Sequence, residues 1–544
     1  MPIQDGQRAG QAAAEVSLIL MLLFIVGGDP SPAINEPHYL CRLKHFWDPQ
    51  FAAGDLFLES RDAHFAVVWS LGWLTQFLSL TQTAWLLRLG AWTLLAVAWQ
   101  RLATTVLPRP WWSVFSAGLL LAGIQEGNLA GEWVIGGFEA KCLAYGFVWL
   151  ALTAWLRERW FWMALWLGIA SAFHVLVGGW AVVILAAIEL LPRAPEKSES
   201  GAAGRWSWLE GVRRRRPGVV AGLAIGGLIA LAGVVPALRL QGAADPETIA
   251  QANQIYVFDR LPHHLAPLSK PLPWIAERAG RHGVVWALLG ITTLLLRRPG
   301  GLSPHTTSRL AQMRAFAYGA GLLALAGFAI EMAFADYPAR AASLLRYYWF
   351  RWIDVAAPMA VGLQAAALAA DRIARRQYAG VGWLAAGIAA TAIPLGMTTF
   401  HRYSDPCPPA DRKAPDAAAW VELCQWVRNE TAPDALFLLP QWSQSFKWRT
   451  GRAEVVTYKD IPQDAAGIVA WSQRRDQVGA VETALRKGRS ELAKQRLLEV
   501  AAKYGADYCI TTRGRALPLA PHHVVGPYLV YDLRRESPPA TGTD

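Results

Sequence analysis

The chain has 544 residues, of which 53% are hydrophobic and 17% are charged, and its formal net charge is +11 at pH 7. Soluble domains are about a quarter charged, so this composition argues against an ordinary soluble protein. The positive charge does not indicate a nucleic-acid-binding protein, because arginines gather in short segments beside apolar runs. Cytoplasmic loops of membrane proteins carry their charge in this way.

Apolar runs of membrane-spanning length recur from the N-terminus to about residue 400. A membrane-spanning helix needs about 20 mostly apolar residues, and we expect about 11–13 such helices. The run at 160–192 is too long for one helix, and His174, Gly178 and Gly179 near its middle predict two helices joined by a tight turn. The runs lie near residues 12–28, 63–80, 84–107, 111–130, 140–157, 160–192, 218–238, 284–297, 315–334, 353–371 and 380–399.

Basic loops predict the orientation of these helices. The loops 193–217, 297–314 and 372–379 are rich in arginine or lysine, so we expect them in the cytoplasm. The loops 239–283 and 335–352 and the C-terminal domain then lie outside. The loop 29–62 has the composition of an external, structured loop, but the number of runs places it inside. One run between residues 63 and 139 is therefore expected to be a half-membrane or re-entrant helix.

Residues 401–544 have the pattern of a soluble α/β domain. Short apolar strands are expected at 436–440, 454–458, 507–512 and 527–533, and helices are expected to begin at Pro415 and to span 481–504, with Gly505 as the C-cap. No glycine-rich phosphate loop is present, so no nucleotide site is expected. The predicted fold is a membrane all-α helical bundle, residues 1–400, followed by an extracytoplasmic α/β domain, residues 401–544.

The loop 29–62 contains the densest group of polar residues, and its candidate catalytic residues are Glu36 and Asp55. Carboxylates beside aromatic side chains can have raised pKa values and serve as general bases. The alternative is a solvated amphipathic segment on the bilayer surface.

Two further groups of cationic side chains lie in external loops. Arg260, His263 and His264 suit a phosphate or a metal, although a role in stabilising the loop explains them as well. Arg346 and Arg351, flanked by aromatic residues, suit a lipid-linked phosphate or an interfacial anchor.

The apolar runs themselves contain two candidate substrate-binding residues, Lys141 and His174. Charged groups inside a membrane bundle need partners. Lys141 can pair with Glu139, and His174 can be a satisfied core histidine.

Several short segments resemble a known superfamily. They are NEPHY at 35–39, FAAGDLF at 51–57, HVLVGG at 174–179, RLPHHLAP at 260–267, LFLLP at 436–440 and YKDIP at 458–462. With them, the chain resembles the GT-C superfamily of polytopic glycosyltransferases, and more closely a bacterial multi-pass membrane family bearing a domain of unknown function.

This resemblance implies transfer of a sugar from a polyprenyl-phosphate donor, a membrane lipid, on the external face of the cell membrane. A first-loop carboxylate acts as base or metal ligand in GT-C enzymes, and Glu36, then Asp55, matches it. No acidic pair follows the first span, because Asn35 precedes Glu36. Arg346 and Arg351 would hold the phosphate, and the His263–His264 pair would position it or a divalent metal.

Two other functions remain open from the sequence. One is a transporter or flippase of a lipid-linked substrate, although the chain shows no internal repeat of the kind that such proteins carry. The other is a non-catalytic membrane scaffold whose external domain binds a partner.

Overall fold

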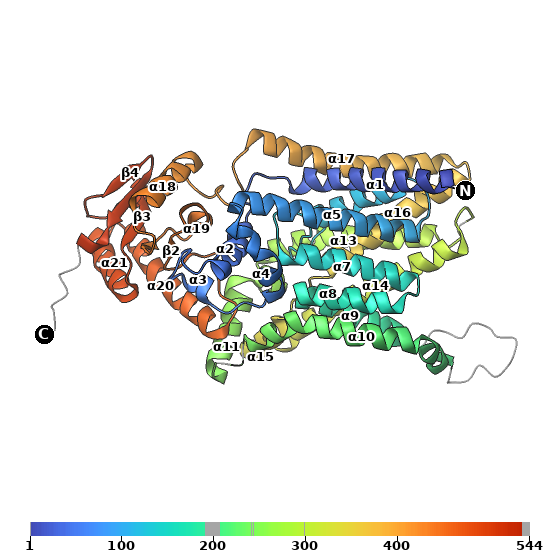
Figure 1. The fold of residues 1–544 in the computed structure, drawn as a ribbon, viewed down its shortest axis with the longest axis horizontal. Helices are drawn as coiled ribbons and strands as arrows, with labels where there is room; N and C mark the ends of the chain where they lie inside the picture. The colour runs from blue at the N-terminus through green and yellow to red at the C-terminus, as the bar shows by residue number, and fades with distance from the viewer. Residues whose placement is uncertain (1, 191–206, 241, 243, 299, 536–544) are drawn as a thin grey trace.

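A computed structural model describes residues 2–190, 207–240, 242, 244–298 and 300–535. Long helices lie side by side in one bundle, and a smaller domain that contains the only sheet of the described residues covers one end of it (Figure 1). The helices of the bundle are α1 (Pro2–Gly27), α5 (Leu80–Val106), α6 (Trp112–Glu126), α7 (Ala140–Leu156), α8 (Trp160–Phe173), α9 (Val175–Leu190), α10 (Ser207–Arg239), α13 (Leu272–Leu295), α14 (Pro304–Ala333), α16 (Ile353–Ala374) and α17 (Tyr378–Ser404).

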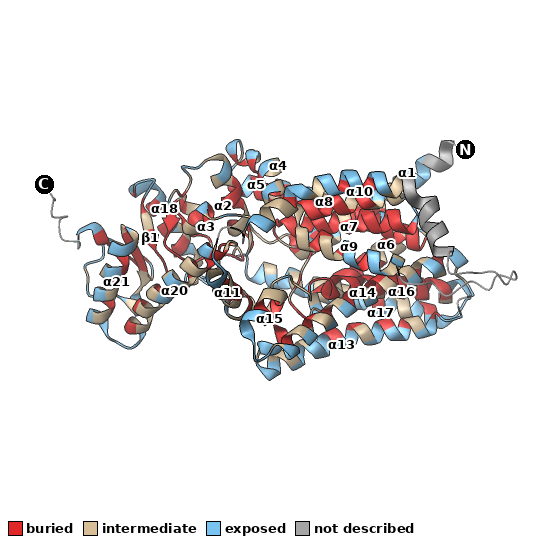
Figure 2. Cartoon of the chain, turned by 90° about the horizontal axis from the view of Figure 1, so that it is seen from below, coloured by how far each residue is buried: buried red, intermediate tan, exposed pale blue. Residues whose placement is uncertain are grey.

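Among the described residues, five helices are long and apolar enough to cross a membrane, and three shorter helices are also apolar. The α16 segment is 89% buried, whereas the corresponding segments of α1, α10 and α17 are 17% buried. Figure 2 shows the same contrast between inner and outer helices. Apolar side chains on the outer helices are exposed, which suits contact with lipid rather than water. The bundle therefore indicates a membrane protein. The five helices span Gly6–Gly27, Gly218–Arg239, Pro304–Ala333, Ile353–Ala374 and Tyr378–Ser404.

The described part of the apolar run at 160–192, which ends at Leu190, forms the two predicted helices. His174 is the C-cap of α8 and directly precedes α9. The helices fold back on each other so closely that a side chain at Gly178 would collide with Ser171. The prediction of two helices meeting near His174 is confirmed.

The run at 63–80 is not a membrane-spanning helix. It forms the short helix α4 (Phe65–Leu71) and the 3₁₀ helix η1 (Gly72–Gln76), which are too short to cross a bilayer. When this run is left out, the segment 28–79 falls at the same end of the bundle as the C-terminal domain. Its helices α2 (Glu36–Trp47) and α3 (Leu56–Glu59) lie beside that domain (Figure 1).

The C-terminal domain contains a five-stranded sheet in the order β2-β1-β3-β5-β4. The strand β1 is parallel to β2 and β3, while β5 is antiparallel to β3 and β4. Strands were predicted at each place except β4, and the second is shorter than expected. The strands are β1 (Leu436–Leu438), β2 (Ala453–Glu454), β3 (Tyr508–Thr512), β4 (His523–Val525) and β5 (Tyr528–Asp532).

Helices cover both faces of this sheet. On one face α18 (Ala417–Glu430) packs Trp420 against Phe437, and on the other α20 (Ala465–Arg486) and α21 (Ser490–Tyr504) enclose Leu438. Successive strand residues point to opposite faces, which makes this a three-layer α/β domain. The helix expected at 481–504 is two helices, separated at Gly488 with φ +68°, and Gly505 caps α21 as predicted.

Candidate functional site

A cavity of about 420 Å³ lies where the bundle meets the C-terminal domain. Its lining comes from α2, the segment 63–64, the loop 127–139, the start of α7, the α8–α9 junction, the end of α10, the segment 256–264, the segment 346–351 and the C-terminal domain. All seven side chains predicted to bind substrate line this cavity: Lys141, His174, Arg260, His263, His264, Arg346 and Arg351.

The cavity carries an excess of positive charge. Five cationic side chains line it, against the two carboxylates of Glu132 and Glu139. Burial lowers the pKa of His263 to about 4, and nearby Arg260 adds to this effect. Burial also places the pKa of His264 well below its usual value. These imidazoles are neutral at pH 7, so the arginines and lysines provide the attraction for an anion.

Arg351 is held in place by contacts on three sides. Its Nη1 lies 2.9 Å from His174 Nε2, and its Nε lies 3.6 Å from Glu132. The guanidinium also stacks 4.3 Å from the centroid of the Tyr348 ring. Because a guanidinium can only donate, His174 must accept through Nε2 and is neutral. Tyr348 has φ +55°, a rare backbone conformation for a non-glycine residue that concentrates at functional sites.

Lys141 sits between the two carboxylates of the cavity. Its Nζ lies 3.3 Å from Glu139 and 3.6 Å from Glu132, and 4.2 Å from the centroid of the Trp133 ring. The amide of Asn35 donates a hydrogen bond to Glu139. Neither carboxylate is therefore a free base, since each already neutralises a cation.

A buried carboxylate that the sequence analysis did not single out shapes the loop 127–139. Asp354 accepts hydrogen bonds from the backbone amides of Leu129, Ala130 and Glu132, at 2.6, 2.9 and 3.0 Å. Asp354 is fully buried and lies three residues after Arg351. It therefore connects the position of Glu132 to that of the segment bearing Arg351.

The histidine pair lies in α12 (Pro262–Leu265), one helical turn. The two rings are 4.0 Å apart instead of pointing to opposite sides as they would in a strand. His264 Nδ1 lies 2.5 Å from the carbonyl oxygen of Ala130, which fixes the ring against the loop 127–139.

The remaining two arginines tie segments together. Arg260 donates from Nε to the carbonyl oxygen of Tyr458 at 3.0 Å, so it links the bundle to the C-terminal domain. Arg346 Nη1 donates to Asn253 Oδ1 at 2.5 Å. Both guanidinium groups retain further N–H donors for a ligand.

His38 is a site residue that the sequence analysis missed. Its ring lines the cavity, and its Nδ1 lies 3.0 Å from Asp460 in the C-terminal domain. When Nδ1–H donates to this carboxylate, Nε2 carries the lone pair. Burial lowers the pKa of His38 and outweighs the opposing effect of Asp460, so the imidazole is a neutral base at pH 7. The signal was present: NEPHY and YKDIP contain these two residues.

Glu36 does not line the cavity. Its two carboxylate oxygens accept from Arg88 Nε and Nη2 at 2.5 and 2.6 Å, and both side chains are fully buried. Backbone amides of Ala33 and Phe138 also donate to it, at 2.8 and 3.1 Å. The structure therefore places Glu36 in a buried ion pair outside the cavity, which favours a structural role for it, and its assignment as the catalytic base stays a prediction.

Asp55, the second predicted catalytic residue, is also outside the cavity. It is the N-cap of α3, accepting from the amide of Leu58 at 3.0 Å, and it pairs with Lys447 at 2.8 Å. Among the described residues, no group of three or more His, Cys, Asp or Glu side chains is placed to hold a metal ion. The divalent metal implied by the resemblance therefore has no fitting ligand set there, and we derive no step through a metal.

Residues 418–478 match the family described as Domain of unknown function (DUF6798). The matched segment begins in α18 and ends in α20, so it includes Asp460 and Lys447 but none of the bundle. A search of curated proteins found no match to the chain.

Proposed function

We propose that this chain is a GT-C-like membrane glycosyltransferase that takes a polyprenyl-phosphate sugar as its donor. The observation that supports it best is the convergence of Lys141, Arg346 and Arg351, from distant segments, on one positively charged cavity at the end of the bundle. The phosphate of a polyprenyl phosphate is an anion at the end of a lipid chain. Such a headgroup suits a positively charged cavity at the end of a membrane bundle.

The orientation in this proposal follows from charge. Arg297, Arg298, Arg372, Arg375 and Arg376 lie at the ends of helices opposite to those that carry the cavity. The positive-inside rule places these residues in the cytoplasm. The cavity and the C-terminal domain then face the extracytoplasmic side.

The cationic side chains suit the donor phosphate. Arg351 and Arg346 present planar donor groups that match two phosphate oxygens at once, while Lys141 adds a point charge. The aromatic rings of Tyr256 and Tyr347, which also line the cavity, offer flat surfaces for a sugar.

The proposed reaction needs one base. The acceptor hydroxyl oxygen forms a bond to the anomeric carbon while the bond from this carbon to the phosphate oxygen breaks, and the electron pair leaves with the phosphate. The hydroxyl proton moves to His38 Nε2. Asp460 holds the ring and stabilises the imidazolium that forms, and Arg351 stabilises the charge on the departing phosphate.

Binding provides the first test of this proposal. Native mass spectrometry of the purified full chain should show undecaprenyl phosphate bound in preference to undecaprenol, its neutral counterpart. Arg351→Gln should remove the preference, whereas Arg340→Gln, on the exposed surface of α15 (Pro338–Leu345), should keep it. Equal binding of phosphate and alcohol would overturn the phosphate site.

Turnover provides the second test. Release of polyprenyl phosphate from polyprenyl-phosphate sugars should depend on His38, with a loss of about 10²–10⁴-fold in His38→Gln. Phosphate-selective binding can also persist without turnover. In that case, movement of a labelled polyprenyl-phosphate lipid from one leaflet to the other in vesicles that contain the protein would favour the flippase instead.

A further inference from the structure

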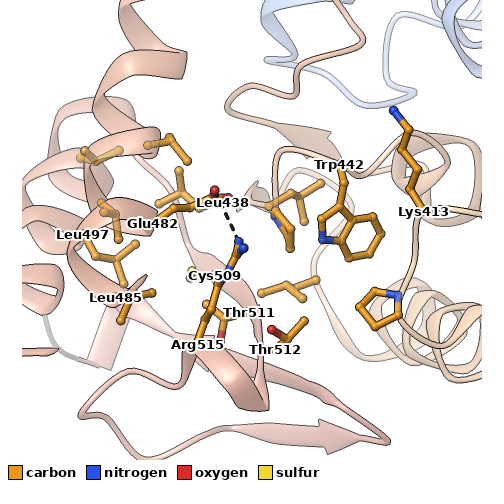
Figure 3. A pocket seen from close by; sticks show the side chains of 17 residues that line it. Lys413, Leu438, Trp442, Glu482, Leu485, Leu497, Cys509, Thr511, Thr512 and Arg515 are labelled. Carbon is orange, nitrogen blue, oxygen red and sulfur yellow. Dashed lines mark ion pairs between the residues drawn. The ribbon is translucent and has the colours of Figure 1, made fainter. Parts of the chain in front are cut away.

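The C-terminal domain contains a second cavity, of about 240 Å³, between its sheet and the helices α20 and α21. Leu438 at the end of β1 and Thr511 and Thr512 at the end of β3 form its floor (Figure 3). None of the residues that line it belongs to the lining of the cavity described above.

This second cavity lies at a particular point of the sheet topology. The strands β1 and β3 are parallel neighbours, and the chain leaves them in opposite directions, from β1 toward β2 and from β3 toward β5 and β4. In α/β sheets, ligands bind in the crevice outside the carboxyl ends of such a strand pair, because the two departing connections leave a gap there.

The walls of the cavity are apolar. Val478, Val481 and Leu485 of α20 face Leu497 and Val500 of α21, and the indole of Trp442 closes one side. The volume equals that of about eight water molecules at about 30 Å³ each, which suits a small organic molecule with a compact apolar body.

Polar groups gather at the mouth. Arg515 Nη1 lies 3.5 Å from Glu482 Oε2, and both side chains retain contact with solvent. Lys413 also belongs to the lining, but its ammonium points away from Arg515 (Figure 3). A partly exposed ion pair at this distance contributes little stability, so Arg515 can exchange Glu482 for the anionic group of a ligand at low cost.

Unpartnered polar atoms mark the same end of the sheet. The Thr511 hydroxyl is buried and has no hydrogen-bond partner within the described part of the chain. The neighbouring Gln441 also has both side-chain polar atoms buried and unpartnered among the described residues, but it is not part of the cavity lining. Buried polar groups are nearly always hydrogen-bonded, so the unpartnered Thr511 hydroxyl beside the cavity favours a bound polar group there.

We propose that this cavity is a binding site for a small organic anion with an apolar body, in which Arg515 binds the anionic group and the space between α20 and α21 holds the rest. This site does not depend on the proposed glycosyltransferase activity. The cationic mouth and the Thr511 hydroxyl select the anion, and the aliphatic walls exclude fully polar ligands such as free sugars.

Phenylacetate is the probe for a test on the full chain in detergent, and phenylacetamide is its neutral counterpart of the same size. Ligand-observed NMR should show saturable binding of phenylacetate. The affinity should fall about tenfold, or about 1.4 kcal/mol, for phenylacetamide and for Arg515→Gln. Val481→Trp, which fills the cavity, should abolish binding of both probes, with Val500→Phe as a second filling variant should the first fail to fold.

The variant Arg351→Gln distinguishes binding at the two cavities. It removes a cation from the cavity of about 420 Å³, the large cavity, and leaves the cavity of about 240 Å³ intact. Binding of phenylacetate that persists in Arg351→Gln and is lost in the filling variants supports the proposal. Binding lost in Arg351→Gln, unchanged in a folded filling variant, equally strong for phenylacetamide, or absent at about 10 mM probe would overturn it.

Discussion

The Lys447 ammonium lies 2.8 Å from the Asp55 carboxylate and so joins the C-terminal domain to the segment that follows α1. The same ammonium lies 3.1 Å from Glu454 and 2.9 Å from Asp460, and all four side chains are buried. Although burial alone would lower the pKa of Lys447, the three carboxylates raise it well above its usual value. Because Asp460 also contacts His38, this cation indirectly supports the imidazole that lines the large cavity.

Lys447→Met should destabilise the protein by about 3–5 kcal/mol, because it leaves buried carboxylates without their cation. Thermal unfolding of the purified chain measures the loss. The matched control is Lys487→Met, on the exposed surface of the same domain, which should change stability by less than about 0.5 kcal/mol. Equal melting temperatures for the two variants would contradict a structural role of Lys447.

Glu36→Gln should act on stability and not on chemistry. The change removes the charge that compensates fully buried Arg88, at an expected cost of about 3 kcal/mol. Turnover per folded molecule should remain within about twofold of the wild type, because Glu36 does not line the cavity. If turnover falls about a hundredfold in a variant that is still folded, Glu36 would be the base after all.

His38 predicts how turnover depends on pH. Burial lowers the pKa of this imidazole below its usual 6.5, and a base must be neutral, so the acid limb of the rate profile should lie below pH 6.5. The same shift affects stability: because the unfolded chain binds this proton more readily, the contribution of His38 is present above pH 6.5 and is lost as the pH falls through the lower, folded-state pKa. In His38→Gln, any residual turnover should lack this limb. An unchanged limb in the variant would assign it to another group.

The sequence was sufficient for the bundle and for the cationic part of the cavity. Hydropathy alone located α16 and α17 to within a few residues, because lipid contact demands uninterrupted apolar length. Lys141, the three arginines, His174 and the His263–His264 pair were found because charge at the edge of an apolar run requires a partner or a ligand, whereas His38 and Lys459 were missed. The run at 63–80 misled the prediction because Trp69, Trp73 and Phe77 count as apolar, although Trp69 and Trp73 are exposed on short helices and Phe77 is exposed just after η1.

The choice of His38 as the proposed base could not come from sequence, because it depends on long-range pairing. Glu36 finds Arg88 in another helix, and His38 finds Asp460, 422 residues away. Local spacing contains no information on such contacts. Of two residues in one short motif, the sequence analysis therefore selected the carboxylate that is paired with Arg88 and passed over the imidazole that lines the cavity.

Arg351→Lys should weaken binding of undecaprenyl phosphate about tenfold or more. A lysine keeps the charge but cannot contact His174 and Glu132 while presenting a planar pair of donors to the phosphate. Native mass spectrometry at a series of lipid concentrations measures the change, with Arg340→Lys as the exposed control. If Arg351→Lys binds the lipid as tightly as the wild type, only the charge of residue 351 matters for binding. The proposed bidentate contact to the phosphate would then be wrong.

Reporter fusions test the orientation on which the proposed external active site depends. A fusion after residue 300, between α13 and α14, should report the cytoplasm, and one after residue 410, beyond α17, should report the external side. A cysteine at Phe77, which is exposed beyond η1, provides an independent check of the segment that does not span. Phe77→Cys should react with a membrane-impermeant maleimide in intact cells, because leaving 63–80 out of the span count places it outside. Labelling only after lysis, together with a cytoplasmic signal after residue 410, would mean that the bundle has the opposite orientation in the membrane. The cavity would then open toward the cytoplasm, where an external polyprenyl-phosphate donor cannot reach it.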